Sequence, residues 1–473
     1  MNLNPSDVIH FLLMGALVYF IVLHGLYFFF IILGAIGQKN YHQGIQFGEF
    51  KRISESPLTL PISVIIPAFN EEKLIVNTAL NILNLRYPKF EVIIVNDGST
   101  DDTFKLLTNR FDLYQIQESY KKNFSTRPIR AIYRSRTHFN LIVIDKENGG
   151  RADSINCGVN LSHYPIICEI DADCVLDKDT FLYMARPFLL DKNVIAATGI
   201  VKPSNGLIVR EGEIISRGIP ERLLPLFQVI EYLRSFQWSR VGLSKIGSML
   251  CMPGAFTFVK KDVFIKIGGA NTKALIDDFE LTVTLQRYIH EHKDEGNFKI
   301  AFVPDPGCYT EVPETIQSFL IQRNFWQRTI LQSLIWNRDM ALNPRYGMAG
   351  IFGFPYFFIF EVLSPIVEIG ILLLAPIAYM LNMATLHEIA LLFVLGILMG
   401  SLTSIFALLL QEKTRLREEK TGNLIRLIVA AFTEHFGYHQ LHSYARLVGI
   451  IQLLFLKNTS RYLIKRIGYH SKE

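Results

Sequence analysis

The sequence predicts an α/β domain with a mainly parallel sheet, flanked by transmembrane helices. Between residues 55 and 345, short apolar runs rich in β-branched residues alternate with helical patterns, an order typical of parallel sheets covered by helices. Of the 473 residues, 50% are hydrophobic and 19% are charged. This composition is too apolar for an ordinary soluble enzyme and too charged for a pure transporter, so we expect a soluble domain joined to membrane segments.

The first apolar span, about Val8 to Ile36, is expected to be a retained transmembrane helix, and we assign residues 1–36 to this N-terminal membrane segment. A signal sequence has an apolar region of only roughly 7–15 residues, with basic residues before it and a small-residue cleavage site after it, and this span lacks those features. Asp7 precedes the span, whereas Lys39 and Lys51 follow it. The positive-inside rule therefore places the N-terminus outside and the next domain, residues 55–315, in the cytoplasm.

The predicted cytoplasmic domain begins with strands and helices in alternation. Its strands are expected at residues 62–66, 92–95, 141–144 and 166–170. Pro67 is expected to end the first strand. Asn70 then suits the N-cap of a helix that reaches about Leu85, with Glu71 in the first turn, where the helix dipole favours an acid.

Asp97 follows the second strand, in a tight Asp-Gly-Ser turn. A carboxylate only accepts hydrogen bonds, so Asp97 suits the imide edge of a uracil. The alternative is a structural Asp that caps a helix at about residues 100–106, and the motif alone favours neither interpretation.

Asp171 and Asp173 follow the fourth strand on alternate residues. Open α/β sheets bind ligands beyond the carboxyl ends of their strands, and two acids so spaced can face one cation from the same side. Hard carboxylate oxygens suit Mg²⁺ or Mn²⁺, which bind a diphosphate with one or two carboxylates. A solvated turn is the alternative.

Asp277 and Asp278 begin a predicted helix. The helix dipole favours acids there, which is the structural interpretation. The functional interpretation is a general base, since transfer of a sugar to a hydroxyl requires a carboxylate within hydrogen-bond reach of the attacking oxygen.

The C-terminal part is expected to be membrane-associated. Residues 316–345 are predicted as amphipathic interface helices, and residues 348–457 as transmembrane or re-entrant helices. Within the latter, 424–457 combines short apolar runs with ionisable residues, which indicates a broken or re-entrant helix lining a cavity, or a surface-lying helix. The number of crossings there stays open. A basic tail, 458–473, is expected in the cytoplasm.

Other binding classes find little support. The five cysteines form no Cys-x-x-Cys pair and all lie in the predicted cytoplasmic domain, which argues against disulfides and a zinc site. The 12 histidines show no metal-ligand spacing. The net charge is only +5, with no basic run interleaved with aromatics in the soluble part, so nucleic acid is not expected as a partner.

Taken in order, the motifs resemble the processive branch of family 2 glycosyltransferases of bacterial membranes, which includes cellulose, hyaluronan and poly-N-acetylglucosamine synthases. The resemblance covers about residues 60–345 and implies a GT-A-like fold. It rests on five segments: 67–71, 95–99, 148–156, 253–256 and 322–326, together with Asp171, Asp173, Asp277 and Asp278. Arg151 stands where a lysine is usual, and Phe325 replaces an arginine that would clamp the diphosphate.

The resemblance also implies roles for single residues. Asp278 would be the catalytic base and Asp173 the metal ligand. The donor-binding residues would be Pro67, Asn70, Glu71, Asp97, Arg151, Asn156 and Asp171. The residues that contact the acceptor and the diphosphate would be Gly254, Asp277, Gln322, Arg323 and Trp326.

We therefore expect an inverting, metal-dependent hexosyltransferase of the cell (inner or plasma) membrane, with Mg²⁺ or Mn²⁺ as cofactor. It would move sugar from a UDP-sugar to a growing β-linked polysaccharide at the cytoplasmic face. Membrane lipid and a secretion subunit are the expected partners, since three or four helices form only a narrow channel. One alternative is transfer of a single sugar to a lipid acceptor, giving a glycolipid, which Phe325 favours slightly. The other is a non-catalytic membrane scaffold or export component.

Overall fold

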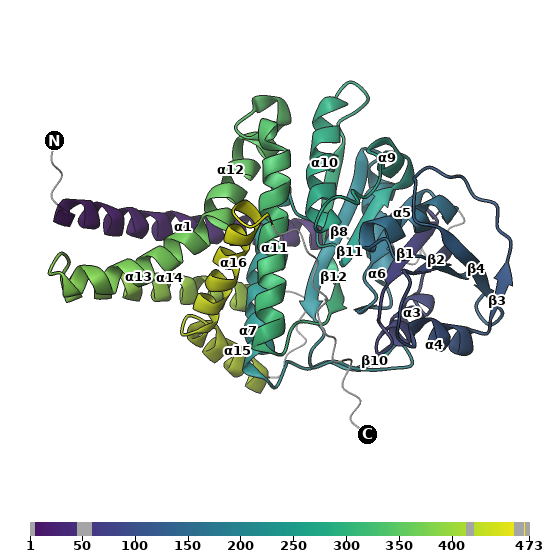
Figure 1. The fold of residues 1–473 in the computed structure, drawn as a ribbon, viewed down its shortest axis with the longest axis horizontal. Coiled ribbons are helices and arrows are strands. Elements are labelled where there is room, and N and C mark those ends of the chain that lie inside the picture. The colour runs from purple at the N-terminus through teal and green to yellow at the C-terminus, as the bar shows by residue number, and fades with distance from the viewer. Residues whose placement is uncertain (1–4, 45–58, 413–420, 458–467, 469–473) are drawn as a thin grey trace.

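The computed structural model describes residues 5–44, 59–412, 421–457 and 468 (Figure 1). Lys51, one basis of the predicted topology, lies outside the described residues, as does the predicted basic tail apart from residue 468. The described chain has a sheet domain at one end and a bundle of apolar helices at the other, and a layer of further helices stands between them (Figure 1).

The centre of the domain is the predicted parallel sheet. Strands β1 (Ile62–Ala68), β2 (Phe90–Asn96), β5 (Leu141–Lys146) and β6 (Ile166–Ile170) are parallel neighbours in the order β5-β2-β1-β6. The sequence suggested that Pro67 ends β1, but this prediction is wrong. The strand continues to Ala68 by pairing with β2 alone, because the pairing with β6 stops at Ile65 and no hydrogen bond is needed from the proline nitrogen on that side.

The edges of this ten-stranded sheet are mostly antiparallel, which the sequence did not predict. On one side of the centre lie β4 (Ile129–Ser135) and then β3 (Leu113–Ile116). On the other side lie, in order, β11 (Phe256–Lys260), β8 (Val194–Pro203), β12 (Lys299–Thr310) and β7 (Cys174–Leu176). Strands β9 (Ile208–Arg210) and β10 (Glu213–Ser216) form a separate hairpin.

Helices cover both faces of the sheet. They are α3 (Ile75–Leu83), α4 (Thr103–Phe111), α5 (Arg151–Leu161), α6 (Thr180–Leu190), α9 (Lys261–Lys266) and α10 (Asp277–Glu291). Side chains alternate along the central strands, so Ile65 and Ile93 join one buried apolar cluster while Val64 and Val92 join the other. Two apolar cores thus hold the sheet fixed and present its strand ends to one side.

The predicted N-cap role of Asn70 is wrong. Helix α3 begins at Ile75, and its N-cap is Leu74, which has no side-chain capping bond. Asn70 instead has a positive φ of 58°, and its side-chain oxygen accepts a hydrogen bond from the Thr100 N–H at 2.8 Å. Asn70 therefore ties the loop after β1 to the loop after β2.

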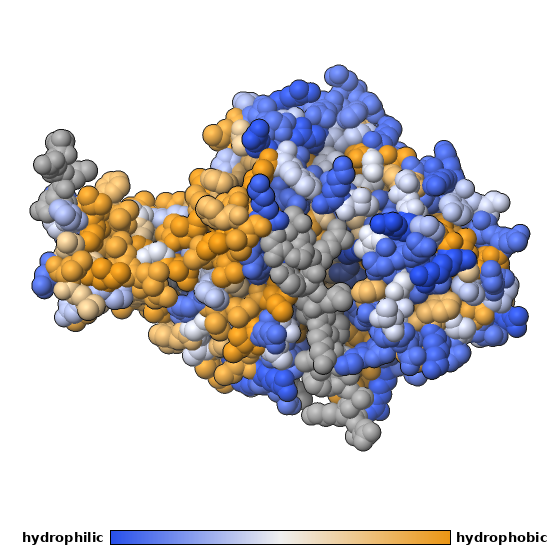
Figure 2. Space-filling model, viewed as in Figure 1, coloured by the Kyte–Doolittle hydropathy of each residue, from blue (hydrophilic) through white to orange (hydrophobic). Residues whose placement is uncertain are grey.

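Three described helices are long and apolar enough to cross a membrane, and they span Pro5–Lys39, Ala349–Met380 and Leu386–Gln411. The first belongs to α1 (Pro5–Gly44) and the last to α14 (Leu386–Glu412). The middle one is built from η4 (Ala349–Gly353), α12 (Phe354–Tyr356), η5 (Phe357–Val362) and α13 (Ser364–Met380). Helices α1, α13 and α14 project from the sheet domain to the same side, and their surface is largely hydrophobic (Figures 1 and 2).

The layer between the sheet and these helices contains three groups. The first is a continuous run of α7 (Leu223–Tyr232), η1 (Leu233–Ser239) and α8 (Arg240–Lys245), and the second is α11 (Ile316–Trp336), followed by the short turns η2 (Arg338–Met340) and η3 (Pro344–Tyr346). The third is α15 (Thr421–Thr433) and α16 (Tyr438–Leu454), so the ambiguous segment 424–457 contains a break between two helices. Gly449 lets α16 approach α11 closely, since a Cβ there would lie 2.7 Å from the Asn324 carbonyl oxygen.

Candidate active site

A pocket of about 1100 Å³ opens beyond the carboxyl ends of β1, β2 and β6, where the parallel sheet predicts a ligand site. Residues from α5, α10, α11 and the loop before β11 complete its wall. The predicted site residues that line it are Pro67, Asn70, Glu71, Asp97, Arg151, Asp171, Gly254, Asp277, Asp278, Gln322 and Trp326. The fold therefore brings most of the sequence-predicted residues to one place.

Asp97 lies just past the end of β2, and its side chain holds the loop before α5. Its Oδ1 accepts hydrogen bonds from the Gly149 N–H at 2.9 Å and from Lys146 Nζ at 2.5 Å, and its Oδ2 accepts one from the Gly150 N–H at 2.7 Å. The capping interpretation is wrong, because α4 begins only at Thr103. Asp97 fixes the Gly149–Gly150 segment and borders the pocket as well.

Lys146, at the end of β5, is a functional neighbour that the sequence did not indicate. Its side chain is fully buried, and its ammonium pairs with both Asp97 and Asp153, the latter at 2.7 Å. In the sequence Lys146 stands among polar residues and reads as a solvated strand end. Only the fold reveals that two carboxylates enclose it.

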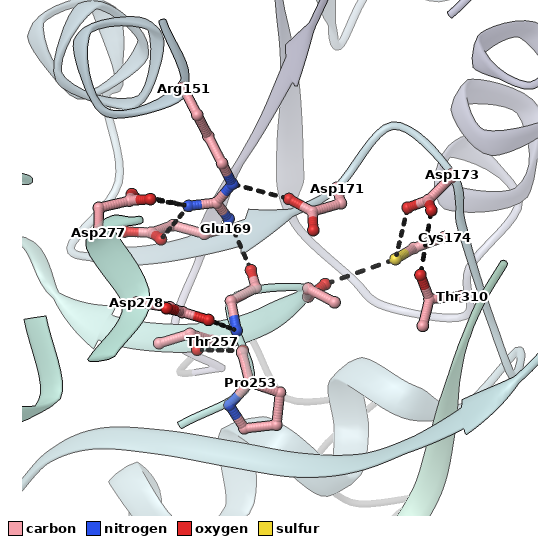
Figure 3. Close-up of polar contacts among 12 residues, drawn as sticks. Arg151, Glu169, Asp171, Asp173, Cys174, Pro253, Thr257, Asp277, Asp278 and Thr310 are labelled. Carbon is pink, nitrogen blue, oxygen red and sulfur yellow. Dashed lines mark hydrogen bonds and ion pairs between the residues drawn. The ribbon is translucent and has the colours of Figure 1, made fainter. Parts of the chain in front are cut away.

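Arg151 is the centre of the acidic cluster (Figure 3). Its Nε donates to Asp171 Oδ1 at 2.9 Å, its Nη1 to both oxygens of Asp277 at 2.7 Å, and its Nη2 to the Gly254 carbonyl oxygen at 2.7 Å. Because guanidinium offers five donors in a rigid fork, one side chain can join the end of β6, the start of α10 and the loop before β11. Arg151 thus sets the relative positions of the predicted donor and acceptor residues.

Glu169 lies beneath this cluster, on β6 (Figure 3). It is 1% exposed, and within the described part of the chain neither carboxyl oxygen has a hydrogen-bond partner, while Arg151 Nη1 lies 4.0 Å away. Burial raises the pKa of the Glu169 carboxyl far above its usual range. The neutral acid form is therefore favoured, which limits the negative charge around Arg151.

Asp278 differs from its neighbour Asp277 in its contacts. The Asp278 carboxylate accepts from the Gly254 N–H at 3.1 Å and from the Phe279 N–H at 2.6 Å, and Asp277 takes the ion pair with Arg151. Burial, and then the adjacent Asp277 charge, raises the pKa of Asp278 to about 6. A carboxylate with this pKa on a pocket wall is suited to accept a proton near neutral pH.

Asp171 and Asp173 do not face one direction, contrary to the expectation from their spacing. The Asp171 side chain is 32% exposed and lines the pocket. Asp173 is 1% exposed and lies off the pocket wall, where its Oδ2 accepts from Thr310 Oγ1 at 3.1 Å. The alternation of a strand does not apply here, because β6 ends at Ile170 and the chain turns.

No group of three or more His, Cys, Asp or Glu side chains is arranged for a metal among the described residues. The residues present still fit a cation of the Mg²⁺ type, which keeps several waters and takes one or two protein carboxylates together with substrate phosphates. Asp171, whose carboxylate borders the pocket, and Asp173 nearby are the carboxylates available for such a cation.

Two other predicted residues also lie off the pocket wall. Asn156 bonds to the backbone of Ala270 on both sides, accepting from its N–H at 2.9 Å and donating to its carbonyl at 2.8 Å, so it fixes a loop. Arg323 is 1% exposed, pairs with Glu231 at 2.9 Å and stacks 4.3 Å from the centre of the Trp326 ring. Arg323 therefore supports Trp326 and does not reach the expected diphosphate position.

The pocket wall contains further residues that the motifs did not single out, namely Lys73, Arg127, Tyr232, Arg240, Cys251, Thr310 and Glu311. Arg240 comes from α8 and Cys251 from the loop that leads to Gly254. Neither belongs to a motif, so no pattern in the sequence connects them to Asp278.

Comparisons with known proteins agree with this geometry. The model of glycosyl transferase family 2 matches residues 63–268, and that of glycosyl transferase family group 2 matches residues 166–408. Poly-β-1,6-N-acetyl-D-glucosamine synthases are 27% identical in Staphylococcus aureus and 26% in Staphylococcus epidermidis, over 266 residues, which are 56% of this chain and 53% of each relative. The chain thus spans about half the length of these curated relatives.

Among solved structures, a mannosyltransferase from Pyrobaculum calidifontis in complex with GDP-mannose and Mn²⁺ aligns with a TM-score of 0.49 at 16% identity, over 94% of this chain and all of that one. The classification depends on the family models instead. One of them covers more than half of the chain, including the acidic motifs from Asp171 to Asp278 and Trp326. The chain therefore belongs to glycosyl transferase family 2 and is a glycosyltransferase.

Proposed function

We propose that this glycosyltransferase uses a UDP-sugar in the cytoplasm and extends a β-linked polysaccharide with inversion at the anomeric carbon. The observation that carries this proposal is Asp278, whose carboxylate borders the pocket and has a pKa of about 6. The names of the staphylococcal relatives support N-acetylglucosamine as the sugar and β-1,6 as the linkage.

The reaction is a single displacement. The acceptor hydroxyl oxygen attacks the anomeric carbon of the donor while the bond from that carbon to the diphosphate oxygen breaks. UDP leaves with the electron pair, and the proton of the hydroxyl passes to the Asp278 carboxylate. A single displacement inverts the anomeric centre, so an α-linked donor gives a β-linked product.

The chain's own residues would hold the donor along the strand ends. Asp97 would accept from the uracil, and the Gly149–Gly150 segment that it fixes would pack beside the nucleotide. Asp171, on the pocket wall, would hold Mg²⁺ or Mn²⁺, which when bound offsets the charge on the departing diphosphate. Asp173 would join it once its carboxylate turns from Thr310 towards the pocket. Arg151 keeps Asp171 and Asp277 in place and leaves Asp278 as the base.

Transfer of one sugar to a lipid acceptor is the second candidate. Phe325 lines the pocket, whereas the two arginines near it on α11, Arg323 and Arg328, are buried off the wall. Neither of these two arginines can therefore hold a growing product near the diphosphate, which favours the addition of a single sugar.

A donor screen tests the function. We would supply the purified full chain in lipid nanodiscs with Mg²⁺ or Mn²⁺, offer UDP-N-acetylglucosamine, other UDP-sugars or GDP-mannose, and measure nucleotide release. We expect release from UDP-N-acetylglucosamine that falls by at least about 10²-fold in Asp278→Asn, because a missing general base typically costs about 10²–10⁴-fold. Product length then separates a polymer from a single-sugar lipid. A folded protein that turns over no donor would contradict the proposal.

A further inference from the structure

A second cavity, of about 270 Å³, lies on the membrane side of α11. Its wall includes Phe20 of α1, Glu368 of α13, Gly396 of α14 and His439 of α16, so it reaches in among the apolar helices. Four residues border both this cavity and the catalytic pocket, namely Arg240, Cys251, Trp326 and Ile330. The two spaces therefore adjoin at a junction made of these four side chains.

The wall of the second cavity is largely apolar but contains charged side chains, and those charges are paired. Arg446 pairs with Glu361 at 3.1 Å, Arg323 with Glu231 at 2.9 Å, and Arg234 with Glu434 at 2.8 Å. Paired charges with aromatic neighbours suit an uncharged polar ligand better than an anion, which would have to compete with each carboxylate. A neutral saccharide has this chemistry.

The position of Asp278 gives the direction in which an acceptor extends. Gly254 donates to Asp278, and the short segment that leads from Cys251 to Gly254 connects the base to the junction. The nucleotide end of the pocket, at Asp97, is built by other strand ends. The junction, with Trp326, is thus a route along which an acceptor whose hydroxyl meets Asp278 can extend.

Arg240 is the cation of this junction. It is half-buried at the start of α8, and its Nη2 donates to Cys251 Sγ at 3.3 Å. Burial raises the pKa of the Cys251 thiol to about 11, so the thiol is neutral and the contact is a weak hydrogen bond, not an ion pair. The Arg240 guanidinium borders both spaces. Arg323 stacks on the Trp326 ring, 4.3 Å from its centre.

We propose that Arg240 binds the acceptor saccharide at this junction, donating hydrogen bonds to its oxygen atoms as the sugar ring packs on Trp326. The inference rests on the proposed function and adds a binding residue to it. Arg240 sets affinity for the acceptor and not for the nucleotide, because Asp97 and the loop after β5 stand at strand ends, whereas Arg240 and Trp326 come from helices α8 and α11.

The test measures acceptor and donor affinity separately in the full chain in nanodiscs. The donor is UDP-N-acetylglucosamine and the acceptor is a β-1,6-linked trimer of N-acetylglucosamine. For Arg240→Gln we expect the acceptor KM to rise about tenfold or more, as for loss of a hydrogen bond from a charged donor, while the donor KM stays within about twofold. Lys245→Gln is the matched control, since Lys245 lies on the same helix, is exposed and borders neither cavity.

Arg240→Lys keeps the charge and loses the fork, so its acceptor KM should lie between those of wild type and Arg240→Gln. If Arg240→Gln does not fold, Arg240→Lys alone tests the inference, by the change in its acceptor KM compared with the change in its donor KM. An unchanged acceptor KM, or an equal rise in both KM values, would overturn the inference while leaving the proposed function intact. A wild-type protein without donor turnover would overturn the proposed function, and the inference with it.

Discussion

At the scale of single residues, adjacent acids in this site have opposite surroundings. Asp277 and Asp278 both begin α10, yet Arg151 binds both oxygens of Asp277 and neither oxygen of Asp278. Asp277 thus has the guanidinium as its partner, whereas burial and the Asp277 charge raise the pKa of Asp278 and make it the stronger base. Different surroundings of this kind give neighbouring carboxyl groups different pKa values, and so different chemical roles.

The first prediction concerns pH. Because the pKa of Asp278 is about 6, the basic form is lost below that pH, and kcat/KM should fall about tenfold per unit of further acidification. Steady-state kinetics between pH 5 and 8 measures this acidic side of the pH–rate profile. The raised pKa also means that the ionised carboxylate lowers stability above pH 6, so Asp278→Asn should unfold at a temperature no lower than wild type at pH 8. A fall in kcat/KM that begins only near pH 4 would contradict the assignment of Asp278 as the base.

The second prediction concerns Lys146. Lys146→Met removes a fully buried ammonium that pairs with Asp97 and Asp153 and leaves both carboxylates without it. Breaking a buried pair costs about 3–5 kcal/mol, so thermal unfolding in detergent should shift markedly downwards. Lys192→Met is the control, because Lys192 is exposed, and it should change the midpoint little. Equal midpoints for both variants would show that the buried pairs contribute little.

At the scale of elements, the sequence predicts those strands whose own residues specify them. The β-branched runs of β1, β2, β5 and β6 are buried on both faces, and all four are confirmed as the parallel centre. The antiparallel edges were missed. Strands such as β3 and β4 contain charged and polar residues, so no continuous apolar run marks them in the sequence.

The candidate site was predictable where a side chain follows directly from the end of a strand or the start of a helix. Asp97, Asp171 and Asp278 border the pocket for that reason. The sequence could not show which face of α11 meets the pocket, and so Arg323 was expected at the diphosphate although it supports Trp326. Arg240 depends on how α8 packs on the sheet domain, which no local pattern encodes.

The third prediction concerns the contact between the loop before β11 and α10. In Gly254→Ala the new Cβ would lie 2.8 Å from both the Cβ and Oδ2 of Asp278, so the loop and the base must move apart. A displacement of this kind costs up to about 10²-fold in rate, and we expect kcat to fall by about 10–100-fold with the fold retained. Gly370→Ala is the control, since its Cβ would meet no atom within 4 Å. Unchanged kcat in Gly254→Ala would contradict a rigid contact.

At the scale of the whole molecule, charged residues mark the boundary between the two halves. The pairs Arg446–Glu361, Arg323–Glu231 and Arg234–Glu434 join the middle layer of helices to the apolar bundle or to itself. Ionisable groups next to a bilayer persist when they pair and face protein or water. This layer therefore joins the sheet domain to the apolar helices and leaves a space beside α11 whose wall combines paired charges with apolar side chains.

The fourth prediction is the topology. If the three apolar helices cross the membrane and the sheet domain is in the cytoplasm, as proposed, the turn between α13 and α14 lies on the outer side. Leu381 lies in this turn and is 57% exposed, so Leu381→Cys should react with a membrane-impermeant maleimide in intact cells. Phe139→Cys is the matched control, because Phe139 is 83% exposed but belongs to the sheet domain, so it should react only after the cells are opened. The native cysteines give little background, since four of the five are buried. Labelling of Phe139→Cys in intact cells, with Leu381→Cys protected, would show that the sheet domain faces outwards. The proposed function would then fail, because it depends on UDP-sugar supplied from the cytoplasm.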